Sequence, residues 1–274
     1  MKSPVQPPAK STTAAGSRRV PAKRSAASLN VFAGTSGWAY PTWKPGFYPG
    51  GTSAKRFLNY YASKLNAVEV NYTFRKLPTQ AMLEGWMAET GADFRFCFKA
   101  PQGITHFKRL KDCDESLALF FKAIEPARAA GRLGLVLFQL PPNFKLNVER
   151  LAVFLAAAAD AAQGVPLAFE FRHESWFCEE IYALLRMHAV ALCVAMNDEL
   201  ETPEVHTAPT HTSFRLRHTG GYKPARLKDF AKKMSALAAD RTVYTFFKHE
   251  DEPTGALNAT AFLQHVKRGR KPAA

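Results

Sequence analysis

Short apolar segments alternate with segments of helical periodicity along most of the chain. The apolar segments are rich in Val, Phe and Leu and predict strands at 30–35, 67–71, 94–99, 133–140, 167–172, 190–195, 212–217 and 242–247. Apolar positions at helical spacing between them predict helices at 53–65, 78–90, 115–130, 148–162, 179–187, 225–238 and 256–265. Segment 197–211, with its Asn, Asp, Glu and Pro, predicts a loop with at most a short helix. Alternation of strand and helix favours a parallel sheet, and eight such units fit a single-domain (β/α)8 TIM-type barrel. A doubly wound open sheet is the alternative, but no GxGxxG motif follows a strand.

The fifth predicted strand carries charges on one of its faces. Apolar side chains at 167, 169 and 171 share one face, whereas Ala168, Glu170 and Arg172 share the other, because side chains alternate along a strand. The second predicted strand repeats this pattern through Glu69 and Asn71. A buried charge needs a partner or a function, so both strands contribute candidate site residues.

The barrel prediction gathers polar side chains at one rim. The outer face of each strand meets helices and must be apolar, so the polar face points inward. The inward polar residues, all in the C-terminal part of their strands, are then Glu69, Asn71, Lys99, Gln139, Glu170 and Arg172. Loops that leave the same strand ends carry Trp38, Tyr40, His106, Arg109, His173 and Trp176. TIM-barrel enzymes keep their active sites at this face, which favours a functional site. The alternative is an ion-pair network that only fills the barrel, with Glu170 neutralised by Arg172 and Glu69 by Lys99.

Charge and cysteine usage change this picture only at the ends of the chain. Of the formal net charge of +14, ten basic residues lie in 1–28 and 267–274, which contain no acid. We therefore expect a disordered basic tail at 1–29, a barrel domain at 30–266 and a basic C-terminal tail at 267–274. Basic tails favour nucleic acid as a partner, although solubilising ends are the simpler interpretation. The four cysteines show no CxxC spacing, which indicates reduced thiols in a cytoplasmic protein. No apolar stretch of about 18 residues or more predicts a membrane helix.

Six motifs in order along the chain resemble the signature of the YecE-like family, a domain of unknown function. They are Gly34-Thr35-Ser36-Gly37-Trp38, Val68-Glu69-Val70-Asn71, Phe98-Lys99-Ala100-Pro101, Ile104-Thr105-His106, Phe138-Gln139-Leu140-Pro141-Pro142 and Phe169-Glu170-Phe171-Arg172-His173-Glu174-Ser175-Trp176. The resemblance covers about residues 31–266 and implies a TIM-type barrel. The family's barrel is similar to those of the endonuclease IV and sugar-isomerase group, which implies nucleic-acid or sugar-phosphate chemistry only by analogy of fold.

The last three strand ends depart from the family pattern. Where the family has Phe-Asn-Asn-Asp after its eighth strand, this chain has Phe247-Lys248-His249-Glu250. The Arg-Leu-His-Gly motif of the seventh strand becomes Arg215-Leu216-Arg217-His218-Thr219-Gly220, which aligns in two ways. The resemblance therefore carries residues over at the first five strand ends only.

Three functions fit the predicted rim. In a hydrolase or lyase acting on a phosphorylated or nucleic-acid substrate, Lys99, Arg109 and Arg172 would bind phosphate oxygens. Glu69 or Glu170 would act as general base and His106 or His173 as general acid, with Asn71 and Gln139 as further substrate contacts and Trp38, Tyr40 and Trp176 as stacking platforms. The first alternative is a non-catalytic binding protein for an anionic ligand or nucleic acid. The second is a glycoside-type enzyme that uses Glu69 and Glu170 as its carboxylate pair.

No cofactor or tightly bound metal is expected. Glu69, Glu170, His106 and His173 could supply ligands, but Lys99 and Arg172 at the same rim would repel a cation. The chain also lacks HExxH spacing. The sequence leaves the oligomeric state open.

Overall fold

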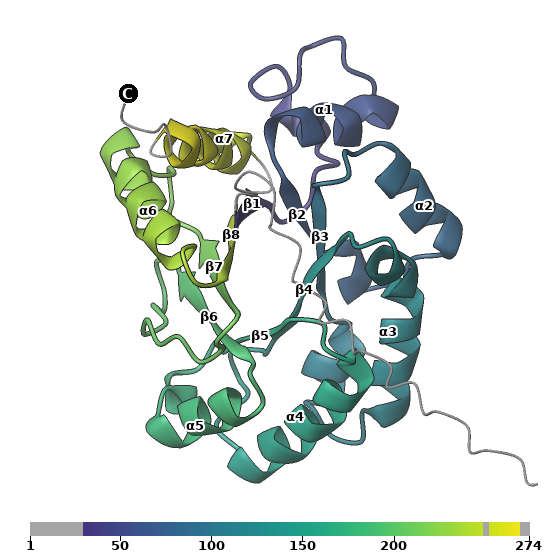
Figure 1. Cartoon of the computed structure of the whole chain (residues 1–274), viewed down its shortest axis with the longest axis vertical. Helices are drawn as coiled ribbons and strands as arrows, with labels where there is room; N and C mark the ends of the chain where they lie inside the picture. Colours follow the sequence, from purple (N-terminus) through teal and green to yellow (C-terminus); the bar gives the residue numbers. More distant parts are fainter. Residues whose placement is uncertain (1–29, 249–251, 269–274) are drawn as a thin grey trace, which may run out of the picture.

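The computed structural model describes residues 30–248 and 252–268, which form an eight-stranded barrel surrounded by helices (Figure 1). The strands are β1 (Val31–Thr35), β2 (Ala67–Val70), β3 (Arg95–Lys99), β4 (Leu133–Gln139), β5 (Leu167–Glu170), β6 (Ala191–Met196), β7 (His211–Leu216) and β8 (Thr242–Phe247). The α-helices are α1 (Phe57–Lys64), α2 (Gln80–Ala88), α3 (Asp114–Ala129), α4 (Val148–Ala162), α5 (Glu179–Met187), α6 (Pro224–Leu237) and α7 (Thr254–Arg268). Short helical turns are η1 (Pro41–Trp43), η2 (Ala54–Arg56), η3 (Tyr72–Phe74), η4 (Gly103–Phe107) and η5 (Glu174–Trp176). The predicted TIM-type α/β barrel is confirmed.

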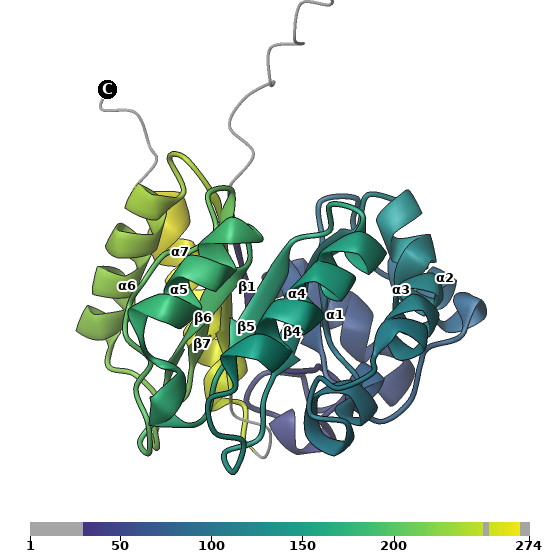
Figure 2. The ribbon, with the colours of Figure 1, turned by 90° about the horizontal axis from the view of Figure 1, so that it is seen from below.

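All strand pairs are parallel and follow the order β1-β8-β7-β6-β5-β4-β3-β2. Every strand therefore ends at the same rim, which Figure 2 shows from another side together with the helices that run back outside the sheet. The long β6–β7 connection, predicted as a loop, contains no helix.

Side chains join β1 to β2 where the backbone ladder stops. The amide of Asn66 accepts from Ala33 N (2.8 Å) and donates to Val31 O (3.0 Å). The hydroxyl of Tyr61 accepts from Thr35 N (2.7 Å) and donates to Ala67 O (2.9 Å). These groups satisfy buried backbone donors and acceptors that would otherwise be unpaired.

A glycine allows this close approach. A Cβ atom on Gly34 would lie 1.9 Å from Ala67 O and 2.5 Å from the Tyr61 hydroxyl. The residue at 34 must therefore be glycine for the two strand edges to meet.

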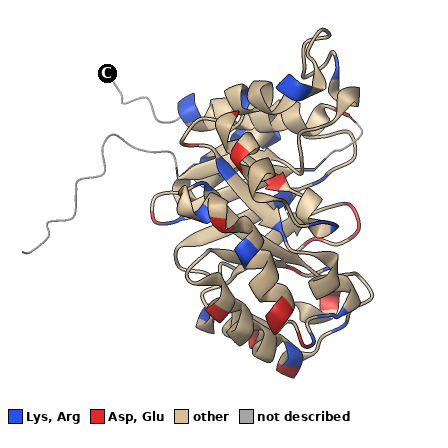
Figure 3. Cartoon of the chain, turned by 90° about the vertical axis from the view of Figure 1, so that its right-hand side faces the viewer, with Lys and Arg blue, Asp and Glu red and all other residues tan. Residues whose placement is uncertain are grey.

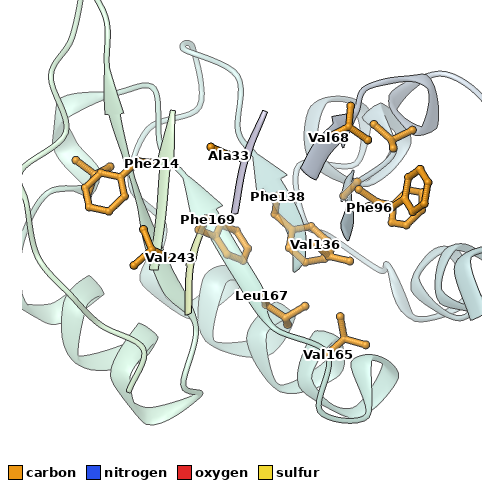
Figure 4. Close-up of a cluster of buried hydrophobic side chains, with 14 of the residues drawn as sticks. Ala33, Val68, Phe96, Val136, Phe138, Val165, Leu167, Phe169, Phe214 and Val243 are labelled. Atoms are coloured by element: carbon orange, nitrogen blue, oxygen red, sulfur yellow. The ribbon is translucent and has the colours of Figure 1, made fainter. Parts of the chain in front are cut away.

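The strands pack on both faces, as the alternating pattern predicts. Outward side chains such as Val68, Phe138 and Phe169 are buried in the main core that lies under the helices (Figure 4). The inward small and apolar side chains form a second buried cluster, which includes Ala67, Cys97, Leu137, Ala168, Cys193 and Phe246. Small and apolar side chains therefore fill most of the barrel below its C-terminal rim.

Two helices begin at residues that cap them. Thr79 accepts from Met82 N (3.2 Å) at α2, and Asn147 accepts from Arg150 N (2.9 Å) at α4. Ser53, at the start of the predicted helix 53–65, makes no side-chain cap hydrogen bond, and a 3-10 turn precedes α1.

The ends of the chain were predicted as tails. Residues 1–29 and 269–274 lie outside the described residues, so that prediction stays untested there. Lys267 and Arg268, expected to begin the C-terminal tail, belong to the last turn of α7, where positive charge complements the helix dipole. Within residues 30–248 and 252–268, no helix has the length and apolar character needed to cross a bilayer.

Candidate functional site

One arginine links the two carboxylates of the rim. Arg215, on β7, donates from Nη2 to Glu69 Oε1 (2.7 Å) and from Nη1 to Glu170 Oε2. All three side chains are at most 5% exposed. The guanidinium thus bridges β2 and β5 across the barrel, from a strand that is adjacent to neither of them in the sheet order.

Strand register places neutral partners around these acids. Gln139 is the register partner of Glu170, and its amide donates to Glu170 Oε1 (2.7 Å). Ser36, just after β1, donates its hydroxyl to Glu69 Oε1 (2.8 Å). Both oxygens of Glu170 are therefore occupied, which orients this carboxylate firmly.

The bridge sets the protonation of its members. Burial alone would raise the pKa of Glu170, but the Arg215 charge and the Gln139 hydrogen bond outweigh it and lower this pKa below the usual value. For Arg215, burial is likewise outweighed by the two carboxylates, which raise the pKa of the guanidinium. Glu170 is therefore a fixed anion at neutral pH and a poor general acid.

The expected pairings of Glu170 with Arg172 and Glu69 with Lys99 are corrected by this geometry. β5 ends at Glu170, so Arg172 lies in the following loop instead of on the strand face. Its side chain is one-third exposed, and its Nη2 lies 3.8 Å from the exposed Glu199. Arg215 pairs with both acids because its long side chain points from β7 into the barrel interior and reaches across to them.

Lys99 and His106 share an aromatic neighbour. The Lys99 Nζ lies 3.9 Å from the ring centroid of Phe74, and the His106 ring meets the same ring edge-on at 4.9 Å. Phe74 ends η3, which is tied to β3 by a hydrogen bond from Thr73 Oγ1 to Lys99 O (2.7 Å). Local hydrogen bonding thus holds the aromatic ring beside the amine.

The pKa values of Lys99 and His106 are both lowered from their ordinary values. Burial first, and then the charge of Arg215, lower the pKa of Lys99 to about 8, against the opposing pull of Glu69 and Glu170. Burial, Lys99 and Arg172 lower the pKa of His106, which is therefore mostly neutral at pH 7. Proton transfer at this rim consequently fits Lys99 and His106 better than Glu170.

A pocket of about 240 Å³ opens beside the bridge, above the ends of β4 to β8. Its lining residues are Gln139, Glu170, Arg172, Ala195, Met196, Asn197, Asp198, Glu199, Arg215, Arg217, Thr219 and Lys248. Asp198 holds one wall by accepting from Thr219 N (3.0 Å) and Thr219 Oγ1 (2.6 Å), with His218 on its other oxygen. These hydrogen bonds lower the pKa of Asp198 to about 2.

Several predicted substrate contacts lie away from this pocket. Trp176 was expected to stack on a substrate, but its side chain is fully buried, stacks on Phe171 at 4.8 Å and donates to Phe144 O (2.6 Å). This expectation is wrong, because the 3-10 turn η5 folds the indole back into the core. Trp38 packs edge-on against Trp86 at 5.2 Å, so its main contact is also internal.

The remaining predicted residues lie at the rim but outside the pocket lining. Tyr40 donates its hydroxyl to Ser36 O (2.8 Å), and Arg109 donates to Asn143 Oδ1 (3.3 Å). His173 caps η5 by accepting from Ser175 N (3.1 Å). Asn71 is half-buried at the start of η3, and its Oδ1 is a buried atom without a hydrogen-bond partner among the described residues.

Arg215, Arg217, Lys248 and Phe74 were missed by the prediction. A signal for Arg215 exists in the sequence, since His211, Ser213 and Arg215 alternate on one face of β7 as Glu69 does on β2. Phe74 carries no signal, because its position depends on the turn after β2.

The four candidate metal ligands are not gathered together. Glu69 and Glu170 contact Arg215, while His106 Nδ1 contacts Thr105 Oγ1 (2.8 Å). Over residues 30–248 and 252–268, no group of three or more His, Cys, Asp or Glu side chains is close enough to hold a metal ion. The absence of a bound metal stays a prediction.

A parallel eight-stranded barrel with a charged pocket at the C-terminal ends of its strands defines this molecule as a TIM-type α/β barrel protein. A family model described as "Protein of unknown function DUF72" matches residues 32–274. The chain therefore belongs to the DUF72 family, and the resemblance to YecE-like proteins is confirmed.

Two curated relatives match parts of the chain. UPF0759 protein YunF of Bacillus subtilis (strain 168) is 31% identical over 156 residues, which cover 56% of this chain and 54% of that protein. UPF0759 protein YecE of Escherichia coli (strain K12) is 36% identical over 114 residues, covering 42% of this chain and 39% of the relative. The chain thus spans about half or less of the length of these relatives.

Solved structures extend the similarity to the whole barrel. A DUF72 family protein from Thermotoga maritima MSB8 superposes with a TM-score of 0.75 at 27% identity, covering 86% of this chain and 99% of the other. An AP endonuclease, family 2, from Brucella melitensis superposes with a TM-score of 0.53 at 10% identity, covering 85% and 97%. The second likeness shows a shared fold alone.

Proposed function

We propose that this chain binds a small phosphate-bearing ligand at the C-terminal mouth of the barrel and catalyses its hydrolysis or elimination. The observation that carries the proposal is the pocket of about 240 Å³, whose lining contains four cationic side chains (Arg172, Arg215, Arg217 and Lys248) and three carboxylates (Glu170, Asp198 and Glu199). Arginine suits phosphate oxygens because its planar fork donates two parallel hydrogen bonds.

The cationic side chains of the pocket differ in whether they are already paired with carboxylates or are exposed to an entering ligand. Arg215 is committed to Glu69 and Glu170, so it contributes mainly a fixed positive field. Arg172 and Arg217 are more exposed, and the one ionic partner of Arg172 among the described residues is Glu199, at 3.8 Å. An entering phosphate would therefore bind first to these two arginines.

Proton transfer belongs to His106 and Lys99 in this proposal. Glu170 keeps Arg215 in place and does not move a proton, because its pKa is lowered by that arginine despite burial. His106, mostly neutral at pH 7, acts as a base, and Lys99 as an acid or a cation according to pH.

The test of binding compares two arginines. We expect inorganic phosphate and ribose 5-phosphate to bind in isothermal titration calorimetry, and Arg172→Ala to weaken both by about tenfold or more, since a hydrogen bond to a charged group contributes about 1.5–3 kcal/mol. Arg186→Ala is the matched control, because Arg186 is similarly exposed but pairs with Glu179 near the end of α5. Equal affinity in both variants would refute the proposed pocket.

The test of catalysis uses His106→Asn. This variant should lower phosphate release from sugar phosphates, or strand cleavage of abasic DNA, by about 100-fold or more. Its affinity for inorganic phosphate should change by less than about threefold. Both reactions are measured with and without Mg²⁺, so that a metal requirement is detected and not assumed.

Non-catalytic binding of an anionic ligand or nucleic acid is the second candidate. The basic residues in 1–28 favour it, since clustered positive charge attracts a polyanion. On the side of the barrel shown in Figure 3, basic positions (blue) and acidic positions (red) are intermixed, so no purely basic surface faces a nucleic acid there. Salt-sensitive DNA binding that disappears on removal of residues 1–29, without any turnover, would support this candidate over catalysis.

The glycoside-type alternative is the weakest of the three. It requires one carboxyl group that stays protonated near neutral pH. Arg215 contacts both Glu69 and Glu170, and it lowers the pKa of Glu170. Neither carboxyl group therefore has the apolar surroundings that such an acid needs.

A further inference from the structure

Lys99 differs from the other buried cation of the barrel mouth. Arg215 forms hydrogen bonds with both carboxylates, whereas Lys99 makes no ion pair within 4 Å among the described residues. Its Nζ rests on the Phe74 ring, and the side chain is only 8% exposed. The amine is thus enclosed beside the pocket without a hydrogen-bonded counter-ion.

The surroundings of Lys99 favour a neutral amine. Burial, Arg215 and Lys248 disfavour its charge, while Glu69 and Glu170 favour it, and the net effect lowers the pKa to about 8. At pH 7.5 this gives on the order of 100-fold more free amine than an ordinary lysine has. Nucleophilic lysines in other enzymes are activated in the same way, by desolvation or a neighbouring cation.

A second titratable group packs on the same aromatic ring as the amine. The His106 and Phe74 ring centroids lie 4.9 Å apart with the ring planes nearly perpendicular, and the charge of Lys99 acts on the pKa of His106. Its Nδ1 is engaged with Thr105 Oγ1, whereas its Nε2 has no hydrogen-bond partner in the part of the chain that the structure describes. A neutral imidazole with one open nitrogen can accept a proton and return it.

We propose that Lys99 is a nucleophile that forms an imine with the carbonyl group of a phosphate-bearing aldehyde or ketone. Nζ attacks the carbonyl carbon, forming the N–C bond, and His106 carries one of the two Nζ protons to the carbonyl oxygen, which becomes the hydroxyl of a carbinolamine. His106 then carries the second Nζ proton to this hydroxyl as the C–O bond breaks, so that one water leaves and a neutral imine remains. The inference rests on the proposed function only for the phosphate group of the substrate.

Reductive trapping tests this assignment. The full chain is incubated at pH 7.5 with sodium cyanoborohydride and either 2-deoxyribose 5-phosphate or unphosphorylated 2-deoxyribose, and adducts are located by peptide mass mapping. We expect Lys99 to be labelled at least tenfold faster than the exposed Lys145. The labelling rate should rise with pH and level off above about 8, following the free amine of Lys99. Labelling of Lys99 no faster than Lys145 overturns the inference, and this result needs no variant.

Two variants separate the inference from the proposed function. Lys99→Arg keeps the charge, so it should lose the adduct at position 99 and still bind inorganic phosphate within about threefold of the original chain. Lys99→Met tests whether removal of the charge alone affects that binding. If phosphate binds but Lys99 is not labelled, only the imine inference fails. If both sugars label Lys99 equally fast, the imine inference stands and the phosphate pocket fails.

Discussion

Replacement of Arg215 by methionine is the most informative test of the bridge at the barrel mouth. The change keeps much of the side-chain volume but removes the cation that contacts Glu69 and Glu170. Among the residues that the structure describes, Glu170 then keeps the Gln139 hydrogen bond and Glu69 keeps that of Ser36. Two carboxylates would then lie buried in the barrel without a hydrogen-bonded positive partner.

The expected cost follows from this burial. Breaking a buried ion pair by removing one partner typically destabilises a protein by about 3–5 kcal/mol. Because a domain is stable by only about 5–15 kcal/mol, Arg215→Met should lose a large fraction of its free energy of unfolding at pH 8. A Glu170→Gln change in the same chain removes one of the uncompensated charges and should restore part of the loss.

The loss should depend on pH with a definite sign. In the unaltered chain the pKa of Glu170 is lowered, so its stabilising effect is present above the unfolded pKa and disappears as the pH falls through the folded pKa. Without Arg215, burial dominates and raises the folded pKa, so the ionised carboxyl destabilises the folded state as the pH rises. The difference between variant and unaltered chain should therefore be smaller at pH 5 than at pH 8, by at least about 1 kcal/mol.

Urea unfolding followed by circular dichroism at pH 5, 6.5 and 8 measures this difference. Arg132→Met is the matched control, because Arg132 is also buried but donates to neutral groups, Phe94 O (3.0 Å) and Thr90 Oγ1 (2.5 Å). The loss of unfolding free energy in Arg132→Met should vary little with pH. A destabilisation below about 1 kcal/mol for Arg215→Met, or the same pH dependence in both variants, would refute the bridge as the organising element of the site.

Three further changes test the contact between β1 and β2 and the core beside the site. Gly34→Ala places a Cβ atom 1.9 Å from Ala67 O and should prevent folding or lower Tm by more than 10 °C, measured by thermal melting; a normal Tm would contradict the described contact of β1 with β2. Tyr61→Phe leaves Thr35 N and Ala67 O without their bridging hydroxyl and should cost about 2–4 kcal/mol in urea unfolding, whereas a loss below about 0.5 kcal/mol would show that the backbone finds other partners. Trp176→Phe should destabilise the chain by about 1–3 kcal/mol and leave phosphate affinity unchanged in calorimetry; a selective loss of affinity would return this side chain to the substrate contacts.

The fold was predictable because its signals are local. Alternating apolar residues in segments such as Leu167–Glu170 define strands that pack on both faces, and helical periodicity defines the segments between them. Eight repeats of this unit leave few topologies open, because parallel neighbours need a crossover and the crossover has one hand. The small differences are at element ends, such as the 3-10 turn that precedes α1.

The site was only partly predictable, because partners come from distant strands. Glu69 and Glu170 could be assigned to the rim from their positions late in inward-facing strands. Their common partner, Arg215, lies 146 residues from Glu69 and 45 residues from Glu170 along the chain. Because the motif around Arg215 aligns with the family pattern in two ways, the sequence did not show which of its residues faces the rim. Lys99 and Arg172, the bases predicted at the same rim, were therefore taken as partners instead.

The sequence by itself determined the barrel, the family and the rim at which charged side chains collect, because periodicity and motifs are encoded residue by residue. Only the tertiary structure decided which charges meet. Closure of the barrel brings Arg215 onto both carboxylates and leaves Lys99 on Phe74, and the turn after β5 folds Trp176 into the core. These choices depend on distances across the barrel, which no local pattern contains. In the function that we propose, they move the general-base role from the two glutamates to His106 and make Lys99 the proton donor.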